Sequence, residues 1–310
     1  MMQIEEHLQY DFERHGSLTP MNQLLIALRY YATGTFQLVV GDLFCITKAT
    51  ICRIVHKVTR AIASLRSKYV KFPSTQQERR DTMYGFYKAT KMPGILGAID
   101  CTHVPIQSPG GDDAEIYRNR KGYFSINVQL VCDKSNYISD VVARWPGSVH
   151  DSTIFDHSRL RAELETQQQD GYLIGDGGYA CRHYLLTPLL NPVTDEQKAY
   201  NTAQISARNC IERTNGILKR RFPALKYGMR LHVDNILPVI VATVVLHNIA
   251  LMVGEEIPPE DQLLHRFVAE QHFNDLCTNY DPVKVAPPAG VHQAPANSMR
   301  QAVINGHFTK

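Results

Sequence analysis

The chain has 310 residues, with 33 Lys and Arg against 30 Asp and Glu, a formal net charge of +3 and a hydrophobic content of 44%. This composition excludes a collagen-like, coiled-coil or wholly disordered chain. No window reaches the ~18 uninterrupted apolar residues of a membrane span, and the seven cysteines form no Cys-x-x-Cys pair, which argues against a zinc module or a disulfide framework. We expect a globular intracellular protein with no membrane association.

The N-terminal part is predicted to be helical. Residues 1–16 form a leading segment, and residues 17–91 form an all-helical module because their apolar residues recur at helical spacing. The run GTFQLVVGDLFCITKATICRIVHKVTRAI predicts a helix, a break near Cys45 to Thr47, and a second helix with Thr47 as N-cap and Lys48 and Arg53 at polar positions. This is the outline of a DNA-binding helix-turn-helix. The alternative is a helical hairpin that only packs on the next domain.

A second domain is predicted from residue 92 to residue 255. The runs ILGAIDCTHVPI, SINVQLVCD, YISDVVARWPGS and GYLIGD read as strands, and an amphipathic helix over about 151–164 lies among them, so the fold class is α/β. Two further helices are expected over 205–225 and 236–253. Residues 256–310 form a C-terminal segment, and its Pro- and Ala-rich composition predicts disorder from about residue 282.

Three carboxylates in this domain attract attention. Asp100 lies within an apolar strand, Asp176 ends another, and Glu212 lies on the long helix, with 35 residues between it and Asp176. Taken singly, each aspartate is explained by a loop cap or an arginine partner. Together they match the Asp-Asp-Glu (DDE) pattern, in which carboxylates from separate elements bind two Mg²⁺ or Mn²⁺ ions for phosphodiester cleavage.

Other side chains belong to the same hypothesis, each with a structural alternative. Asp151 could cap the helix that follows it or bind the metal ions. Gly216, one turn after Glu212, indicates close approach of a backbone, of substrate or of a packed strand. Two basic clusters are candidates for DNA phosphates, with a solvated helix face as the alternative for the second. They are Arg118, Arg120 and Lys121, and then Lys219, Arg220 and Arg221.

Several ordered motifs resemble the Harbinger transposase-derived nucleases, the PIF/Harbinger branch of the DDE superfamily endonucleases. They are GAIDCTHVPIQSP, YRNRKGYFSINVQLVCD, WPGSVHDSTIF, GDGGYACRHYLLTPL, ARNCIERTNGILKRRFPAL and VLHNIAL, and the resemblance spans about Leu18 to Gly254. It implies an RNase H-like DDE core behind the helix-turn-helix-like module. It also implies that Asp100, Asp151, Asp176 and Glu212 bind the divalent metal.

The resemblance also implies partners and a location. We expect a nuclear protein, also present in the cytoplasm, that binds DNA and a Myb-like DNA-binding partner protein. A homo-oligomer is a further expected assembly. The lead before the helical segment is shorter than is usual in the family, so an incomplete N-terminus is left open.

The leading functional hypothesis is a divalent-metal-dependent DNA endonuclease that uses a two-metal mechanism, with Asp100, Asp176 and Glu212 as catalytic residues. The alternative from another class is a domesticated, non-catalytic DNA- or chromatin-binding protein that keeps the fold. A third reading, an RNase H or resolvase acting on structured nucleic acid, does not explain the N-terminal helices.

Overall fold

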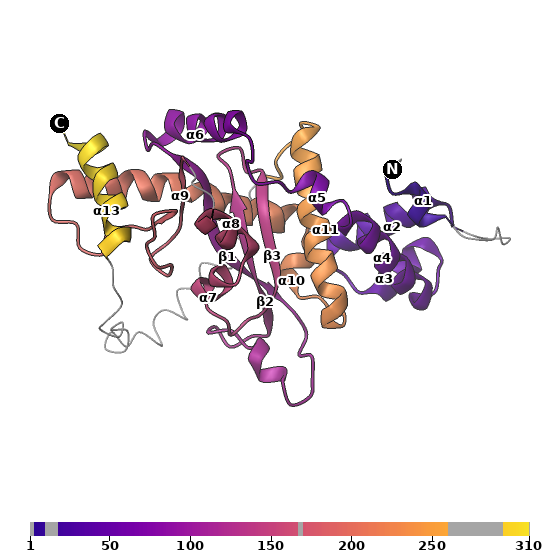
Figure 1. The fold of residues 1–310 in the computed structure, drawn as a ribbon. Coiled ribbons are helices and arrows are strands. Elements are labelled where there is room, and N and C mark those ends of the chain that lie inside the picture. Colours follow the sequence, from indigo (N-terminus) through magenta and orange to yellow (C-terminus); the bar gives the residue numbers. More distant parts are fainter. Residues whose placement is uncertain (1–2, 10–17, 167–169, 260–293, 310) are drawn as a thin grey trace.

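The computed structural model describes residues 3–9, 18–166, 170–259 and 294–309 (Figure 1). The helices before the sheet are α1 (Glu5–Leu8), α2 (Pro20–Thr33), α3 (Gln37–Phe44), α4 (Lys48–Ala63), α5 (Arg66–Tyr69) and α6 (Gln76–Thr90). The strands are β1 (Ile95–Pro105), β2 (Ser125–Cys132), β3 (Ile138–Pro146), β4 (Tyr172–Ile174) and β5 (Leu185–Leu186). The other helical segments are η1 (Ala114–Tyr117), α7 (Asp151–Asp156), α8 (Arg159–Thr166), α9 (Asp195–Arg221), α10 (Ala224–Tyr227), α11 (Val233–Met252), α13 (Ala294–Val303) and η2 (Ile304–Phe308).

Local chemistry fixes the break between α3 and α4. Cys45 ends α3 in the left-handed region at φ 54°, and Thr47 caps α4 by accepting a hydrogen bond from the Thr50 N–H at 3.3 Å. Gly41 lets the chain turn back closely, because a Cβ there would lie 2.5 Å from the Ile46 carbonyl oxygen. The predicted break and the predicted N-cap at Thr47 are both confirmed.

The sheet has five strands in the order β3-β2-β1-β4-β5. Strand β2 runs antiparallel to β1 and β3, whereas β4 runs parallel to both β1 and β5. β4 pairs with residues 95 to 98 of β1, with Ala98 opposite Ile174. On its other side β1 pairs with β2, with Asp100 opposite Leu130. The sheet is therefore mixed, and the strand that carries Asp100 lies at its centre.

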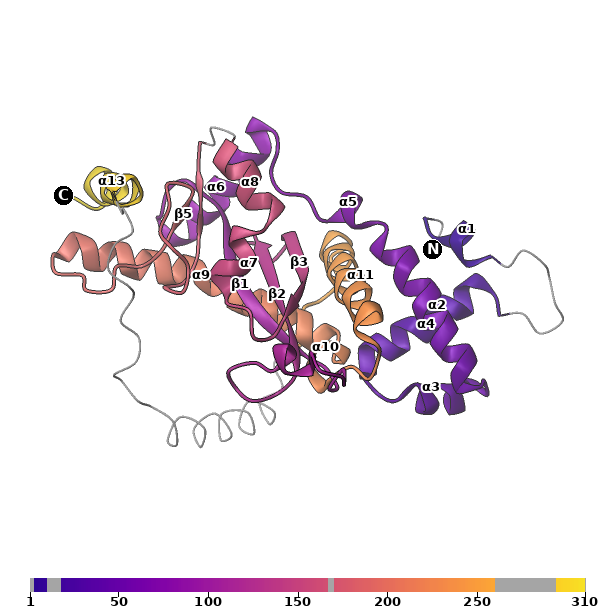
Figure 2. The same cartoon turned by 60° about the horizontal axis from the view of Figure 1, so that its bottom comes forward.

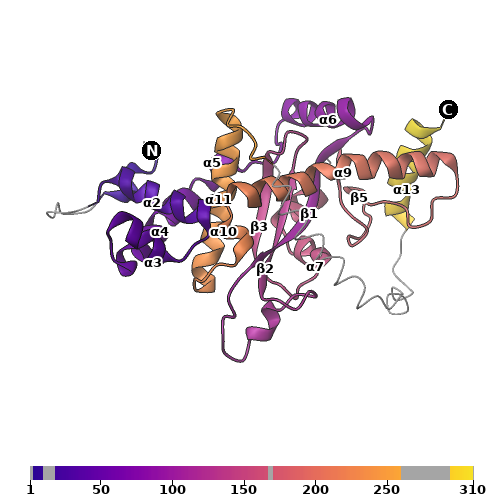
Figure 3. The same cartoon turned by 180° about the vertical axis from the view of Figure 1, so that it is seen from behind.

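Helices cover both faces of this sheet, in agreement with the expected α/β class. On one face, Ile99 and Val131 pack with Phe155 and Leu160 from α7 and α8. Residues that alternate with these, such as Leu130, belong to the core formed with α9 on the other face. Figure 1 shows α7 and α8 in front of the sheet, and Figure 3, from behind, shows α9 crossing it.

Helix α11 joins the sheet to the N-terminal helices. It contacts β3 on one side and α4 on the other, and Figure 2 shows it between them. By length and composition alone α11 could cross a membrane, but 56% of its most apolar window is buried inside the protein. Asn248 on α11 accepts a hydrogen bond from the Ile138 N–H (2.9 Å) and donates to Ile138 O and Tyr69 O (both 2.7 Å). These contacts describe a core helix.

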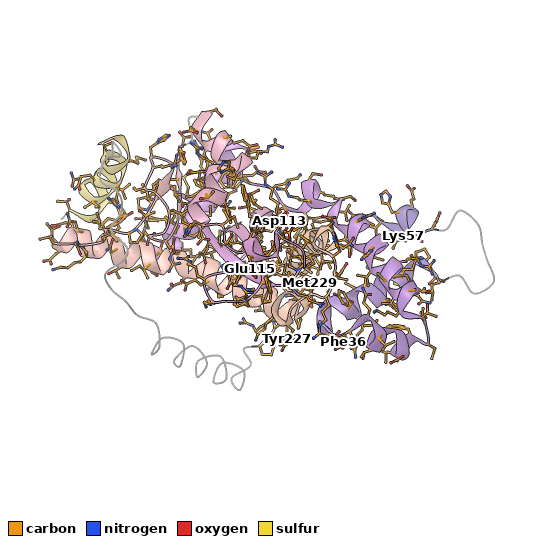
Figure 4. The ribbon with its side chains drawn as sticks, turned by 90° about the horizontal axis from the view of Figure 1, so that it is seen from below. Phe36, Lys57, Asp113, Glu115, Tyr227 and Met229 are labelled. Carbon is orange, nitrogen blue, oxygen red and sulfur yellow. The ribbon has the colours of Figure 1, made fainter. Side chains whose placement is uncertain are left out.

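A second junction connects α2, and the residues between α2 and α3, to α10. Phe36 and Tyr227 line one hollow there, and Figure 4 shows them next to one another. The Arg230 guanidinium stacks 3.9 Å from the centre of the Phe36 ring. Gly34 is needed at this point, because its φ is +63° and a Cβ would lie 3.0 Å from Ala224 Cα.

Two of the predicted helices have different bounds. The helix expected over 151–164 is divided into α7 and α8, because Ser158 accepts a hydrogen bond from the Arg161 N–H at 3.1 Å and so begins a new helix. The helix expected over 205–225 begins earlier, at Asp195. Thr194 and Gln197 form a capping box at that end, which the periodicity of apolar residues did not indicate.

The C-terminal segment differs from the disorder predicted from about residue 282. Residues 260–293 lie outside the described residues, but residues 294–308 form α13 and the π-helix η2. Ile304 is buried, and the Phe308 ring packs edge-on at 6.1 Å from the Tyr200 ring of α9. Packing against α9 supplies the apolar burial that the local composition lacks.

We expect Asn248→Ala to lower the free energy of unfolding by about 2–3 kcal/mol, because it leaves the buried Ile138 N–H without an acceptor. Urea denaturation followed by circular dichroism measures this. The control Asn235→Ala, at a half-exposed position of the same helix, should change it by less than about 0.5 kcal/mol. Equal effects of the two substitutions would show that the Asn248 hydrogen bonds add no stability.

Candidate active site

Asp100 lies in the middle of β1, on the face turned toward α9. Asn215 of α9 donates a hydrogen bond from Nδ2 to Asp100 Oδ2 at 3.4 Å. Burial, followed by the negative charge of Asp176, raises the pKa of Asp100 from 3.8 to about 7, and the charge of Asp151 adds to this. The Cys101 N–H and the charge of Arg208 act in the opposite direction. A carboxyl group in this state needs a cation or a proton nearby.

Asp176 follows β4 and is set by the parallel register. Ala98 of β1 lies opposite Ile174, the last residue of β4. Asp100 follows Ala98 by two residues and Asp176 follows Ile174 by two residues, so the register brings both to the same level. Asp176 Oδ1 accepts a hydrogen bond from the Gly178 N–H at 2.9 Å, and the carbonyl of Gly175 accepts one from Gln204 of α9 at 2.7 Å. These contacts hold the end of β4, where the charge of Asp176 acts on Asp100.

Asp151 is the first residue of α7. Its Oδ1 accepts a hydrogen bond from Asn127 Nδ2 of β2 at 2.9 Å, and its charge contributes to the raised pKa of Asp100. His150 is the residue at the N-cap of α7, and among the described residues no side chain makes a capping hydrogen bond there. Asp151 therefore does not cap α7, and its charge acts on Asp100 instead.

Glu212 lies further from this group. Its side chain is 51% exposed, and its Oε1 forms an ion pair with Arg208 Nη2 at 2.6 Å. Among the described residues, no three His, Cys, Asp or Glu side chains converge closely enough to hold a metal ion. Asp151 and Asp176 thus lie near enough for their charges to act on Asp100, while Glu212 pairs with an arginine on its own helix.

By chemical type, the donor atoms present here are those that a hard divalent cation prefers. Asn127 and Asn215, whose amide nitrogens hold Asp151 and Asp100, each have a buried Oδ1 that accepts no hydrogen bond from any described residue. Buried oxygens without donors and crowded carboxylates are the ligands that Mg²⁺ and Mn²⁺ prefer. The two asparagines were not predicted, although Asn215 lies three residues after Glu212 and so on the same helix face.

The second basic cluster is largely occupied inside the protein. Lys219 donates to Thr102 Oγ1 at 2.7 Å and to His103 O at 2.8 Å, and burial lowers its pKa to about 8. The Arg221 side chain is 7% exposed and pairs with Glu255 at 2.8 Å. Neither cation is presented to a DNA backbone, contrary to expectation. The Arg220 side chain extends toward Gly216, one turn earlier on α9, and its Nη1 would lie 3.2 Å from a Cβ at that position. Gly216 therefore leaves space for the Arg220 side chain.

The other predicted DNA contacts lie on the surface. Arg118 pairs with Glu115 at 2.7 Å and stacks 4.3 Å from the Phe124 ring centre, whereas its neighbours Arg120 and Lys121 are exposed. On the N-terminal helices, Lys48 and Arg53 are exposed on α4, far along the chain from the aspartates. The structure therefore separates the basic residues into two exposed groups and one partly buried group that is largely engaged within the protein.

Comparisons with known proteins place this chain in a family. The profile of the DDE superfamily endonuclease matches residues 99–248, which contain all four carboxylates. The human protein named "Putative nuclease HARBI1" is 33% identical over 82% of this chain and 76% of its own length, and the mouse protein of that name is 35% identical over 88% and 80%. "Protein ALP1-like" of Arabidopsis thaliana is 26% identical over 84% of this chain and 66% of its own. No solved structure matches significantly.

The domain is thus that of a DDE superfamily endonuclease, a class in which carboxylates generally bind divalent metals. Within that class, the chain belongs to the Harbinger-derived family of the HARBI1 nucleases. The family resemblance predicted from the sequence motifs is confirmed.

The raised pKa of Asp100 predicts a pH-dependent stability. The folded protein holds a proton on Asp100 up to about pH 7, and the unfolded chain releases it near pH 3.8, so the free energy of unfolding falls as the pH rises between these values. Asp100→Asn removes this loss. In metal-free buffer we expect the variant to be more stable than the wild type at pH 8, by up to about 4 kcal/mol at ~1.4 kcal/mol per pKa unit.

Urea denaturation at pH 5 and pH 8, with a chelator present, measures the difference between the two proteins. The stabilisation should be clearly smaller at pH 5. The same difference at both values would contradict a raised pKa for Asp100.

Proposed function

We propose that this protein is a divalent-metal-dependent DNA endonuclease with an RNase H-like core. The observation that supports it most is that the charges of Asp176, at the end of β4, and of Asp151, on α7, both act on Asp100 of β1 and raise its pKa. The relatives suggest the reaction class, since the human and mouse proteins are named "Putative nuclease HARBI1". The central position of β1 and the packing of α9 across the sheet favour the RNase H-like arrangement.

In this proposal Asp100, Asp176 and Glu212 are the catalytic carboxylates, and Asp151 is a fourth metal ligand. Bound Mg²⁺ or Mn²⁺ supplies the Lewis acid that activates a water or hydroxyl and stabilises the leaving oxygen. The chain itself sets the directions of the carboxylates. Asn127 holds Asp151, and the Gly178 N–H holds Asp176. In metal enzymes, loss of such a hydrogen bond to a metal ligand typically lowers metal affinity or activity by about 10–100-fold.

The N-terminal helices are proposed to act as a helix-turn-helix-like DNA-binding module. Arg53, His56, Lys57 and Arg60 of α4 line a hollow of about 470 Å³ together with His7 of α1. The opposite side of α4 is buried in the core, so the basic side is the one that can meet DNA. Figure 4 places Lys57 on the side of these helices away from Phe36, and therefore away from the junction with α10.

Further proposals rest on the family resemblance alone. They are a nuclear location with some protein in the cytoplasm, a Myb-like DNA-binding partner and self-association. A separate import partner would be consistent with the modest net charge of +3.

The alternative is a domesticated protein that binds DNA or chromatin without cutting it. The ion pair between Arg208 and Glu212 favours this reading, because it engages the third carboxylate of the triad at 2.6 Å. The two functions share the fold and the DNA-binding surface. Cleavage distinguishes them.

We expect the wild type to nick plasmid DNA with Mg²⁺ or Mn²⁺, and Asp100→Asn, Asp176→Asn and Glu212→Gln each to lower the rate more than about a hundredfold, because loss of a ligand should exceed loss of an outer contact. Asn127→Ala should lower it about 10–100-fold. Asp195→Asn, an exposed carboxylate at the start of α9, is the matched control and should cleave normally.

Gel assays of supercoiled plasmid over time give these rates. Cleavage that survives in the three carboxylate variants would rule out this nuclease site. Wild-type binding without cleavage in either metal would instead favour the domesticated binder.

For DNA binding, we expect Arg53→Gln with Arg60→Gln to weaken duplex affinity and to reduce the slope of log K against log salt by about 2, because each lost phosphate contact reduces it by roughly 1. Fluorescence anisotropy in chelator, from about 50 to 200 mM salt, measures both quantities. Arg159→Gln, an exposed arginine paired with Glu163 on α8, should leave them unchanged. If the double variant keeps the wild-type slope, DNA does not bind on this side of α4.

A further inference from the structure

Arg208 belongs to the side of α9 that faces β1. Arg208, Glu212, Asn215 and Lys219 follow one another at intervals of four, three and four residues, so they form one stripe along the helix. Asn215 in this stripe reaches the carboxylate of Asp100, and Lys219 reaches the backbone of β1. The guanidinium therefore lies on the side of α9 from which Asn215 reaches Asp100.

The contact between Arg208 and Glu212 is closer and less exposed than an ordinary surface ion pair. Nη2 lies 2.6 Å from Oε1, and the arginine side chain is 19% exposed while that of the glutamate is 51% exposed. A charge-assisted hydrogen bond of this kind is stronger than a neutral one, and partial burial reduces its screening by solvent. One oxygen of Glu212 that would ligate a metal ion is thus already engaged by a cation.

The same guanidinium also acts on Asp100. Its positive charge opposes the burial and the Asp176 charge that make ionisation of Asp100 unfavourable. Arg208 therefore pairs with Glu212 on α9, and its charge also acts on Asp100 of β1, which Asn215 of the same stripe contacts. A divalent ion shared by Glu212 and Asp100 would have to occupy the same region.

We propose that Arg208 is a resident cation of the carboxylate site, which holds Glu212 while the metal is absent and must leave it before Glu212 can bind a divalent ion. This inference rests on the proposed metal-dependent function. Two cations cannot share these oxygens without strong repulsion, since the interaction of charges grows as the effective dielectric falls in a half-buried site. The long arginine stem lets the guanidinium move away while its backbone stays in the helix.

In this role Arg208 lowers the affinity for the metal, and it is a positioning residue because it acts through Glu212. A purely structural ion pair would orient Glu212 for the metal and raise that affinity. The two roles therefore predict changes of opposite sign when the arginine is removed.

The test is isothermal titration of the metal-free, full-length protein with Mn²⁺ in the absence of DNA. We expect Arg208→Gln to bind Mn²⁺ about tenfold more tightly than the wild type, because a positive charge close to the ion has been removed. Arg208→Lys keeps the charge and should remain within about threefold of the wild type. Lys198→Gln removes a cation of the same helix that pairs with Asp195 in solvent, and it should change nothing.

Circular dichroism of each variant confirms that it is folded, and Arg208→Lys provides a second measurement if Arg208→Gln is not. Equal or weaker Mn²⁺ binding by Arg208→Gln, or tenfold tighter binding by Arg208→Lys, would overturn the role of Arg208. Absence of Mn²⁺ binding in every protein would overturn both this inference and the metal-dependent function. Tighter binding in Arg208→Gln without DNA cleavage by the wild type would overturn only the nuclease.

Discussion

A single carboxylate in the central strand constrains much of this molecule. Asp100 lies at a position of β1 that α9 covers and where an apolar side chain would be expected. A charge there is unfavourable without a compensating group. The groups around Asp100 act on its charge in opposite directions. A donor comes from Asn215, a positive charge from Arg208, and yet two more carboxylates approach from α7 and from the end of β4. An arrangement that adds anions to a buried anion makes sense chemically when a cation is to be received there.

Helix α9 connects this carboxylate to the rest of the fold. Along its 27 residues it reaches the end of β4 through Gln204, Asp100 through Asn215 and the segment after α11 through Arg221. Near its N-terminal half, Tyr200 packs against η2 at the far end of the chain. The same helix thus supports the end of β4 and carries both Glu212, the proposed metal ligand, and Arg208, the cation proposed to oppose metal binding.

The sequence predicted what depends on local chemistry. The break before α4, its cap at Thr47, the strand around Asp100 and the spacing from Asp176 to Glu212 are encoded in short patterns of apolar and capping residues. Contacts made across the chain could not be read in this way. The helix of residues 294–303 belongs to a segment whose composition predicts no structure. The roles of Lys219 and Arg221 depend on the directions of their side chains, because two residues that are two positions apart point in directions that differ by roughly 200° around the helix axis.

The 35 residues between Asp176 and Glu212 do not form a uniform interval. The first part, up to Thr194, is mostly loop with the two residues of β5, and the rest is continuous helix that Gln204 anchors to Gly175. An insertion in the loop would leave the phase of α9 intact, whereas one extra residue between Gln204 and Glu212 would turn the glutamate by about 100° around the helix axis. The spacing of 35 residues therefore has two parts. The loop can change in length, whereas the number of helical residues between Gln204 and Glu212 sets the direction of Glu212 around the axis of α9.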